Sequence, residues 1–192
     1  MNYSANDYSA LIGMEGFSET LLKNHFTLYQ GYVNNTNKLM QLLDNMLNEE
    51  KAATPEYAEL KRRMGFEFNG MRLHEYYFDN LGGKDKYSDY PKAVKAIEEG
   101  YGSYANWEKD FKATGAMRGI GWVILYQDNT SGRLFNQWIN EHETGHFAGC
   151  SPILVMDVFE HAFITDYGLK RMDYIEAFFK NIRWEAVEKR LI

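Results

Sequence analysis

Two long stretches in the first half of the chain carry apolar residues at helical spacing. The first runs from Ser18 to Leu43, where Ser18 followed by Glu19 is typical of a helix N-terminus. Thr54-Pro55-Glu56 marks a second helix start, because a proline at the first helical position has no backbone donor to lose, and this pattern continues to Gly82-Gly83. The spacing predicts two long helices joined near residues 49–53 as an antiparallel hairpin.

The pattern of apolar residues changes after Gly82-Gly83, from two long helical stretches to shorter segments. This change predicts a domain boundary, with domains at 1–82 and 83–192. Short helices are expected at 91–99 and 104–114. Residues 121–126 are rich in β-branched and aromatic side chains and lead into a turn, so we expect a hairpin with 133–139 and a third strand at 153–158. The tail at 174–191 is expected to form one closing amphipathic helix.

Composition narrows the class of protein and its setting. The 192 residues are 45% hydrophobic and 25% charged, as in compact globular proteins. A single cysteine, Cys150, cannot form an intramolecular disulfide, and no apolar run approaches the roughly 20 residues of a membrane span. The N-terminus lacks the layout of a signal peptide, so we expect a cytoplasmic protein without a membrane partner. With 21 Lys and Arg against 27 Asp and Glu, nucleic-acid binding is not expected.

The five histidines are the candidate chemical groups. His25 and His74 lie on the two predicted hairpin helices, and Asp157 precedes His161 by four residues. Three imidazoles and one carboxylate form a ligand set suited to iron or manganese. From the residues alone the alternative stays open, because a histidine on an apolar helix face is often a hydrogen-bonded core residue, and an Asp and a His four apart often pair at the surface.

Motifs spread over the chain resemble those of the iron/manganese superoxide dismutases. The strongest is Asp157-Val158-Phe159-Glu160-His161-Ala162-Phe163 with Arg171-Met172-Asp173-Tyr174 after it, similar to the family strings D-x-W-E-H-A-Y and R-x-D-Y. Gly119-Ile120-Gly121-Trp122 resembles G-x-G-W, and His74 to Phe78 resembles a helix motif H-x-x-[FY]-W. The matches run in order from about Phe17 to Leu191.

The resemblance implies an α+β fold, in which an N-terminal α-helical hairpin packs on a C-terminal α/β domain with a three-stranded antiparallel sheet. It implies a superoxide dismutase that converts superoxide to dioxygen and hydrogen peroxide. One iron or manganese ion per subunit is then held by His25, His74, Asp157 and His161, with a solvent molecule as fifth ligand. The sequence does not distinguish iron from manganese.

Further roles follow from the same resemblance. Tyr32 matches a tyrosine that relays protons and screens the metal. The family's second-shell glutamine position before the second His is Gly70 here, so we expect the donor to the bound solvent to be His142, with His146 as the competing candidate. Glu160 is expected to reach the partner's metal ligand across a homodimer interface, with a tetramer as the alternative assembly, and Arg171 is expected to guide superoxide.

The chain also departs from the family pattern. His25 and Tyr32 are seven positions apart where the family typically has eight, which raises the question of whether Tyr32 still faces the metal. Leu28 and Tyr29 replace a family histidine, and Ile164 replaces a tyrosine, so the route to the metal is expected to be rebuilt. An alternative is therefore a metal-binding or interaction protein on the same scaffold with little turnover.

Overall fold

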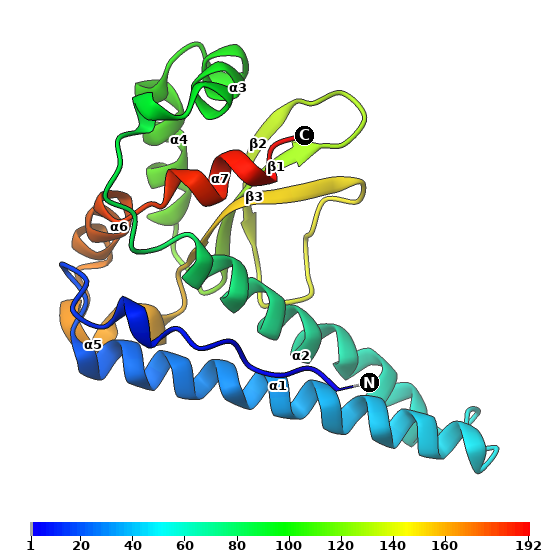
Figure 1. The fold of residues 1–192 in the computed structure, drawn as a ribbon. Coiled ribbons are helices and arrows are strands. Elements are labelled where there is room, and N and C mark those ends of the chain that lie inside the picture. The colour runs from blue at the N-terminus through cyan, green and yellow to red at the C-terminus, as the bar shows by residue number, and fades with distance from the viewer. Residues whose placement is uncertain (1) are drawn as a thin grey trace.

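The structure, a computed structural model, describes residues 2–192 and sets a long helical hairpin beneath a small sheet flanked by short helices (Figure 1). Within this described part of the chain, no helix combines the length and apolar character needed to cross a membrane.

The hairpin consists of α1 (Glu19–Asn48) and α2 (Pro55–Asp79), which pack side by side in opposite directions (Figure 1). Ser18 caps α1 by accepting from the backbone N–H of Leu21, and Thr54 caps α2 by accepting from that of Tyr57. Each cap pairs an N–H that has no partner inside its helix. The predicted hairpin and both of its helix starts are thereby confirmed.

A short segment before the hairpin lies along it. It contains the 3-10 helix η1 (Ser9–Leu11), and the stretch before η1 follows α1 and α2 in Figure 1. The side chain of Asn37 on α1 accepts from the Tyr3 backbone N–H at 2.8 Å and donates to its carbonyl at 2.9 Å. The paired bonds dock the segment on the helix.

The predicted strands are confirmed as β1 (Trp122–Asp128), β2 (Leu134–Ile139) and β3 (Cys150–Asp157), antiparallel in the order β2-β1-β3. The central strand β1 is buried from Trp122 to Tyr126, and these residues are apolar or aromatic on both faces of the sheet. Gly121 precedes β1 with φ +136°, and a Cβ there would lie 2.0 Å from the Ile139 carbonyl oxygen. Only glycine permits this entry into the sheet.

Short helices surround the sheet. After the 3-10 helix η2 (Tyr87–Asp89), α3 (Pro91–Tyr101) and α4 (Tyr104–Gly115) occupy the two predicted positions. Gly102 ends α3 in the left-handed conformation at φ +78°, and Ser103 caps α4. The chain after β3 forms the 3-10 helix η3 (Glu160–Ala162) and the one-turn helix α5 (Ile164–Tyr167).

The prediction of one closing helix over 174–191 is wrong, because the structure has two, α6 (Arg171–Lys180) and α7 (Trp184–Arg190). The break falls at Asn181, whose side-chain amide donates to the Ala177 and Glu15 carbonyls at 2.8 and 2.9 Å. The N–H of Arg183 donates to the Asn80 carbonyl at 2.6 Å instead of continuing the helix. Partners distant in the sequence thus form hydrogen bonds with the backbone groups at the break, which allows the helix to end there.

Asn80 joins three elements where α2 ends. Its side chain is fully buried, donates to the Val155 carbonyl on β3 at 2.6 Å, and accepts from Arg190 on α7 at 2.5 Å. Because a buried amide without partners is costly, these bonds fix the end of α2 against the sheet. These bonds fix the position of α2, which carries His74, relative to β3, which carries Asp157.

Candidate metal centre

Four elements each contribute one ligand-type side chain to a single point. His25 comes from α1, His74 from α2, Asp157 from the last position of β3 and His161 from η3. One ligand atom from each lies within 4.8 Å of all the others. The structure therefore brings together the four residues that the sequence nominated as metal ligands.

The three imidazoles converge on one carboxylate oxygen. Oδ2 of Asp157 lies 2.9 Å from Nε2 of His161, 3.2 Å from Nε2 of His25 and 3.6 Å from Nε2 of His74. The side chains of His25, His74 and Asp157 are fully buried, whereas that of His161 is 28% exposed. The cluster therefore lies inside the protein and has one edge at its surface.

The hydrogen bonding of His74 shows that the cluster fits a cation. Nδ1 of His74 lies 2.5 Å from the Gly70 carbonyl oxygen, which only accepts, so Nδ1 carries the proton and Nε2 presents a lone pair. That Nε2 is buried and has no hydrogen-bond partner. A lone pair aimed at a buried carboxylate is unfavourable unless a positive ion lies between them, and nitrogen and oxygen donors of this kind suit iron or manganese.

Protonation states agree with that use of the site. Burial would raise the pKa of the Asp157 carboxyl, but the charge of His161 and the hydrogen bonds of His161 and His25 hold this pKa well below its usual value. Burial lowers the pKa of His25 and lowers that of His74 further. At neutral pH the cluster therefore offers an anionic oxygen from Asp157 and the neutral imidazole nitrogens of His25 and His74.

Aromatic side chains enclose the cluster and hold its backbone. Phe78 packs on the ring of His25 with centroids 4.9 Å apart, and Phe159 stacks on His161 at 5.4 Å. The hydroxyl of Tyr174 donates to the Asp157 carbonyl at 2.5 Å and accepts from Tyr77 at 3.2 Å. The sequence assigns Tyr174 no role, although a buried phenol on an apolar helix face needs a polar partner.

Tyr32 faces the cluster despite its shortened distance from His25 along the chain. Helix α1 is α-helical without interruption over Glu19–Asn48. At about 100° per residue, seven positions return to nearly the same face, whereas eight would leave Tyr32 about 80° away. The ring of Tyr32 stacks on that of His74 at 5.2 Å. The spacing is therefore the one a regular helix needs.

His142 connects Tyr32 to the sheet. Its Nδ1 accepts from the indole N–H of Trp122 at 3.0 Å, and its Nε2 lies 2.8 Å from the Tyr32 hydroxyl. Burial lowers the pKa of His142 to about 4, so its imidazole is neutral and the single proton is on Nε2. Nε2–H therefore donates to Tyr32, which leaves the phenolic hydrogen free to point elsewhere.

His146, the competing candidate, occupies a different place. Its side chain is half-buried between the Tyr126 hydroxyl, at 2.6 Å, and the His142 carbonyl, at 2.7 Å. It is therefore bonded to the backbone that carries His142 and does not contact the four clustered residues through any of its hydrogen bonds.

Glu160 and Arg171 are not among the four clustered residues. Glu160 is exposed beside His161, and Arg171 begins α6. The guanidinium of Arg171 donates to the Met117 and Gly119 carbonyls, both at 2.6 Å, and lies 5.3 Å above the Phe163 ring. Arg171 thus holds the loop that leads into β1, a contact that the sequence analysis did not foresee.

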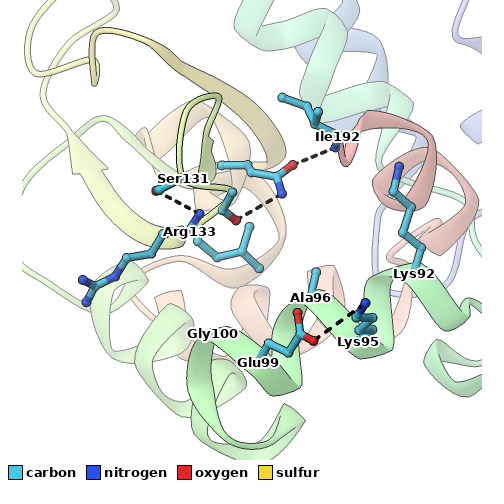
Figure 2. A pocket seen from close by; sticks show the side chains of 11 residues that line it. Lys92, Lys95, Ala96, Glu99, Gly100, Ser131, Arg133 and Ile192 are labelled. Atoms are coloured by element: carbon cyan, nitrogen blue, oxygen red, sulfur yellow. Dashed lines mark hydrogen bonds and ion pairs between the residues drawn. The ribbon is translucent and has the colours of Figure 1, made fainter.

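A large surface pocket of about 630 Å³ lies elsewhere, between α3, the β1–β2 turn and the end of α7 (Figure 2). None of its 11 lining residues belongs to the metal cluster. Its cations do not converge, because Lys95 pairs with Glu99 at 3.8 Å and Arg133 points away from Lys92 (Figure 2). This pocket is not the opening to the cluster.

A hairpin and a three-stranded sheet that hold three histidines and one aspartate around a point define a mononuclear metal protein. A sequence model of the iron/manganese superoxide dismutases, C-terminal domain, matches residues 88–190. The chain is 40% identical to a superoxide dismutase [Fe] of Aquifex pyrophilus, over 92% of this chain and 85% of that protein. It therefore belongs to the iron/manganese superoxide dismutase family.

Other relatives differ in the metal that their names give. A superoxide dismutase [Fe] of Cupriavidus metallidurans is 36% identical over 92% of this chain and 89% of its own length. A superoxide dismutase [Mn] of Haloferax volcanii is 33% identical over 90% of this chain and 85% of its own length. The similarity extends across both halves of the fold.

The packing of Tyr32 over Gly70 gives the first testable prediction. A Cβ at Gly70 would lie 2.5 Å from Cδ1 of Tyr32, whereas one at Gly31, also inside a helix, would meet nothing within 4 Å. Gly31→Ala should raise the free energy of unfolding by about 0.5–1 kcal/mol through helix propensity. Gly70→Ala should lower it by about 1–2 kcal/mol, because overpacking outweighs that gain.

Urea denaturation of the two variants beside the parent protein measures both changes. If Gly70→Ala were as stabilising as Gly31→Ala, Tyr32 would not lie where the structure places it.

Proposed function

We propose that this chain is a superoxide dismutase that uses one iron or manganese ion held by His25, His74, Asp157 and His161. The observation that carries the proposal is the convergence of three imidazole nitrogens on Oδ2 of Asp157 inside the protein. Family membership and the names of relatives, which specify iron in some and manganese in others, support the choice of metal.

The reaction joins two superoxide anions and two protons into one dioxygen and one hydrogen peroxide. The bound ion would supply the one-electron couple that this chemistry needs. Asp157 contributes an anionic oxygen that offsets the charge of the ion, and the lone pair of His74 is fixed toward it by the Gly70 carbonyl. The protein thus preorganises its donors before substrate arrives.

Tyr32 and His142 would handle the protons. His142 donates to the Tyr32 oxygen at 2.8 Å, so the Tyr32 hydroxyl can donate its own proton toward the cluster. Burial and the charge of Asp157 raise the pKa of Tyr32, which keeps the phenol protonated at neutral pH. A protonated, oriented hydroxyl beside the site is suited to deliver a proton to a reduced oxygen species.

The ligand set is tested by metal content and turnover. We expect the wild-type chain to retain one equivalent of iron or manganese after dialysis and to turn over superoxide. His161→Ala should lose most of the metal, because it removes the donor 2.9 Å from Asp157. Elemental analysis measures the metal content, and pulse radiolysis measures the turnover of superoxide.

His146→Ala is the matched control for metal content, since it removes a histidine that lies outside the cluster. Full metal in His161→Ala would overturn the ligand assignment. Full metal in the wild type without turnover would favour the alternative, a metal-binding protein on this scaffold.

We also propose a homodimer formed over the surface around His161. Nε2 of His161 faces Asp157, so Nδ1 is the nitrogen left for a partner, and Glu160 beside it is exposed. Arg171 contacts Met117, Gly119 and Phe163. The exposed apolar side chains at or next to these contacts along the chain are Met117, Ile120, Ile164 and Met172. An apolar patch around a carboxylate and an imidazole edge suits an isologous interface, in which Glu160 bonds the partner's His161.

Sedimentation equilibrium tests this interface. Glu160→Ala should weaken the dimer at least about tenfold in dissociation constant, since a charge-assisted hydrogen bond is lost and His161 keeps an unpaired nitrogen. Glu185→Ala, on the exposed face of α7, should leave the association unchanged. A monomeric wild type at micromolar concentration would rule the dimer out; the same experiment distinguishes a tetramer.

Substrate guidance by Arg171 is a further part of the proposal. A protein of net charge −6 repels superoxide on average, so local positive charge near the cluster has to offset that field. Lys170 and Arg171 supply such a pair where α6 begins. Burial lowers the pKa of Arg171, which still remains a cation at neutral pH.

Arg171→Gln removes this charge and keeps an amide that can donate to the Gly119 carbonyl. We expect a second-order rate constant roughly twofold to fivefold lower at low ionic strength, with the difference shrinking as salt screens the field. Lys189→Gln makes the same charge change on α7 and should not alter the rate. Equal rates for Arg171→Gln and wild type at low salt would exclude guidance by this residue.

The division into domains 1–82 and 83–192 is proposed as well. Support comes from Gly82, which has φ +80°, and from the separate packing of α1 on α2 and of the three strands on one another. The cytoplasmic location and the lack of a nucleic-acid partner, both argued from composition, remain predictions.

A further inference from the structure

The loop that carries His142 is held in a strained conformation. It connects β2 to β3, and an isolated bridge pairs Asn140 with Thr144 across it. Between them Glu141 has φ +53°, in the left-handed region that non-glycine residues rarely adopt. Such a residue persists only where the surrounding contacts over-determine the backbone. The His142 ring would turn with the loop if those contacts were lost.

His146 supplies the contact that ties this loop to the sheet. The His142 carbonyl can only accept, so Nε2–H of His146 donates to it at 2.7 Å, and Nδ1 of His146 forms a hydrogen bond of 2.6 Å with the Tyr126 hydroxyl. Tyr126 lies on the central strand, is 1% exposed, and stacks on Phe147 at 5.7 Å. The Tyr126 hydroxyl, His146 and the His142 backbone therefore form a continuous link to the most buried strand.

A second link from the same strand reaches the His142 ring. Trp122, four residues before Tyr126 on β1, donates to Nδ1 of His142 at 3.0 Å. One strand thus fixes the backbone of His142 through His146 and the ring of His142 through Trp122. Both constraints are needed, because an imidazole held at one nitrogen alone can pivot about that bond and lose the 2.8 Å contact with Tyr32.

We propose that His146 is a positioning residue, which acts through the His142 carbonyl and holds the ring where Trp122 can donate to Nδ1, so that Nε2–H of His142 donates to Tyr32. The inference rests on the proposed function only for its catalytic consequence, since the hydrogen-bonded arrangement itself does not require turnover.

Nitrogen NMR of the full-length chain labelled at histidine tests the arrangement, in the metal-free form and after zinc is added as a diamagnetic ion. Wild-type His142 should show one bare nitrogen, Nδ1, and one protonated nitrogen, Nε2. In His146→Ala, and in Tyr126→Phe, which keeps the aromatic stack, these two signals should shift toward a common average. His146→Gln, whose amide can donate to the carbonyl, should restore the wild-type pair. Ser151→Ala, which removes an exposed hydrogen bond at the same end of the sheet, should change nothing.

Turnover of the metal-loaded protein tests the consequence. His146→Ala should retain its metal and turn over superoxide about fivefold more slowly, the effect of one hydrogen bond. In a Tyr32→Phe background the same substitution should have no further effect, because the group that His142 positions is gone. Unchanged His142 signals in His146→Ala, or a fivefold loss that persists without the Tyr32 hydroxyl, would overturn the proposal. The NMR measurement needs no turnover. An inactive wild type would therefore contradict the proposed function, whereas the His142 signals alone would still decide whether His146 positions His142.

Discussion

The buried negative charge of Asp157 is the constraint on which the arrangement of the chain depends. Removing a carboxylate from water costs several kcal/mol unless its oxygens are paired. In this fold His25, His74 and His161, from three separate elements, all lie close to one oxygen of Asp157. A further bond, from Tyr174 to the Asp157 carbonyl, fixes the backbone at the same residue. The hairpin and the sheet therefore meet at Asp157, and a bound cation would neutralise its remaining negative charge.

Proton direction is set by a chain of donors that begins at the sheet. The indole of Trp122 has only a donor, so it fixes which nitrogen of His142 is bare, and the proton on the other nitrogen is directed at Tyr32. Each tautomer is decided by its neighbour, and none by the metal ligands directly. This separates two tasks, since the cluster residues would hold the ion while the sheet decides the direction in which the phenol donates.

Close approach between the two hairpin helices makes the second task possible. Tyr32 packs against Gly70, where any side chain would collide with its ring, and the carbonyl of the same Gly70 orients His74. One residue thereby places the phenol and directs a metal ligand. The absence of a side chain at position 70, which the sequence comparison presented as a missing donor, is a steric requirement for Tyr32.

The hairpin, the three strands and the types of metal ligand could be predicted from the sequence. Apolar spacing, the caps at Ser18 and Thr54, and the turn before residue 133 predicted the hairpin and the three strands, because these signals are local to a few residues. Motif order nominated His25, His74, Asp157 and His161, which the structure brings together. Three features could not be predicted from local sequence: the break of the last helix at Asn181, the bonds of Arg171 to the loop before β1, and the support of His142 by His146. Those outcomes depend on hydrogen-bond partners outside the local stretch of chain. Asn181 bonds Glu15, 166 residues away, Arg171 bonds Met117, 54 residues away, and His146 bonds Tyr126, 20 residues away. Local periodicity carries no information about such partners.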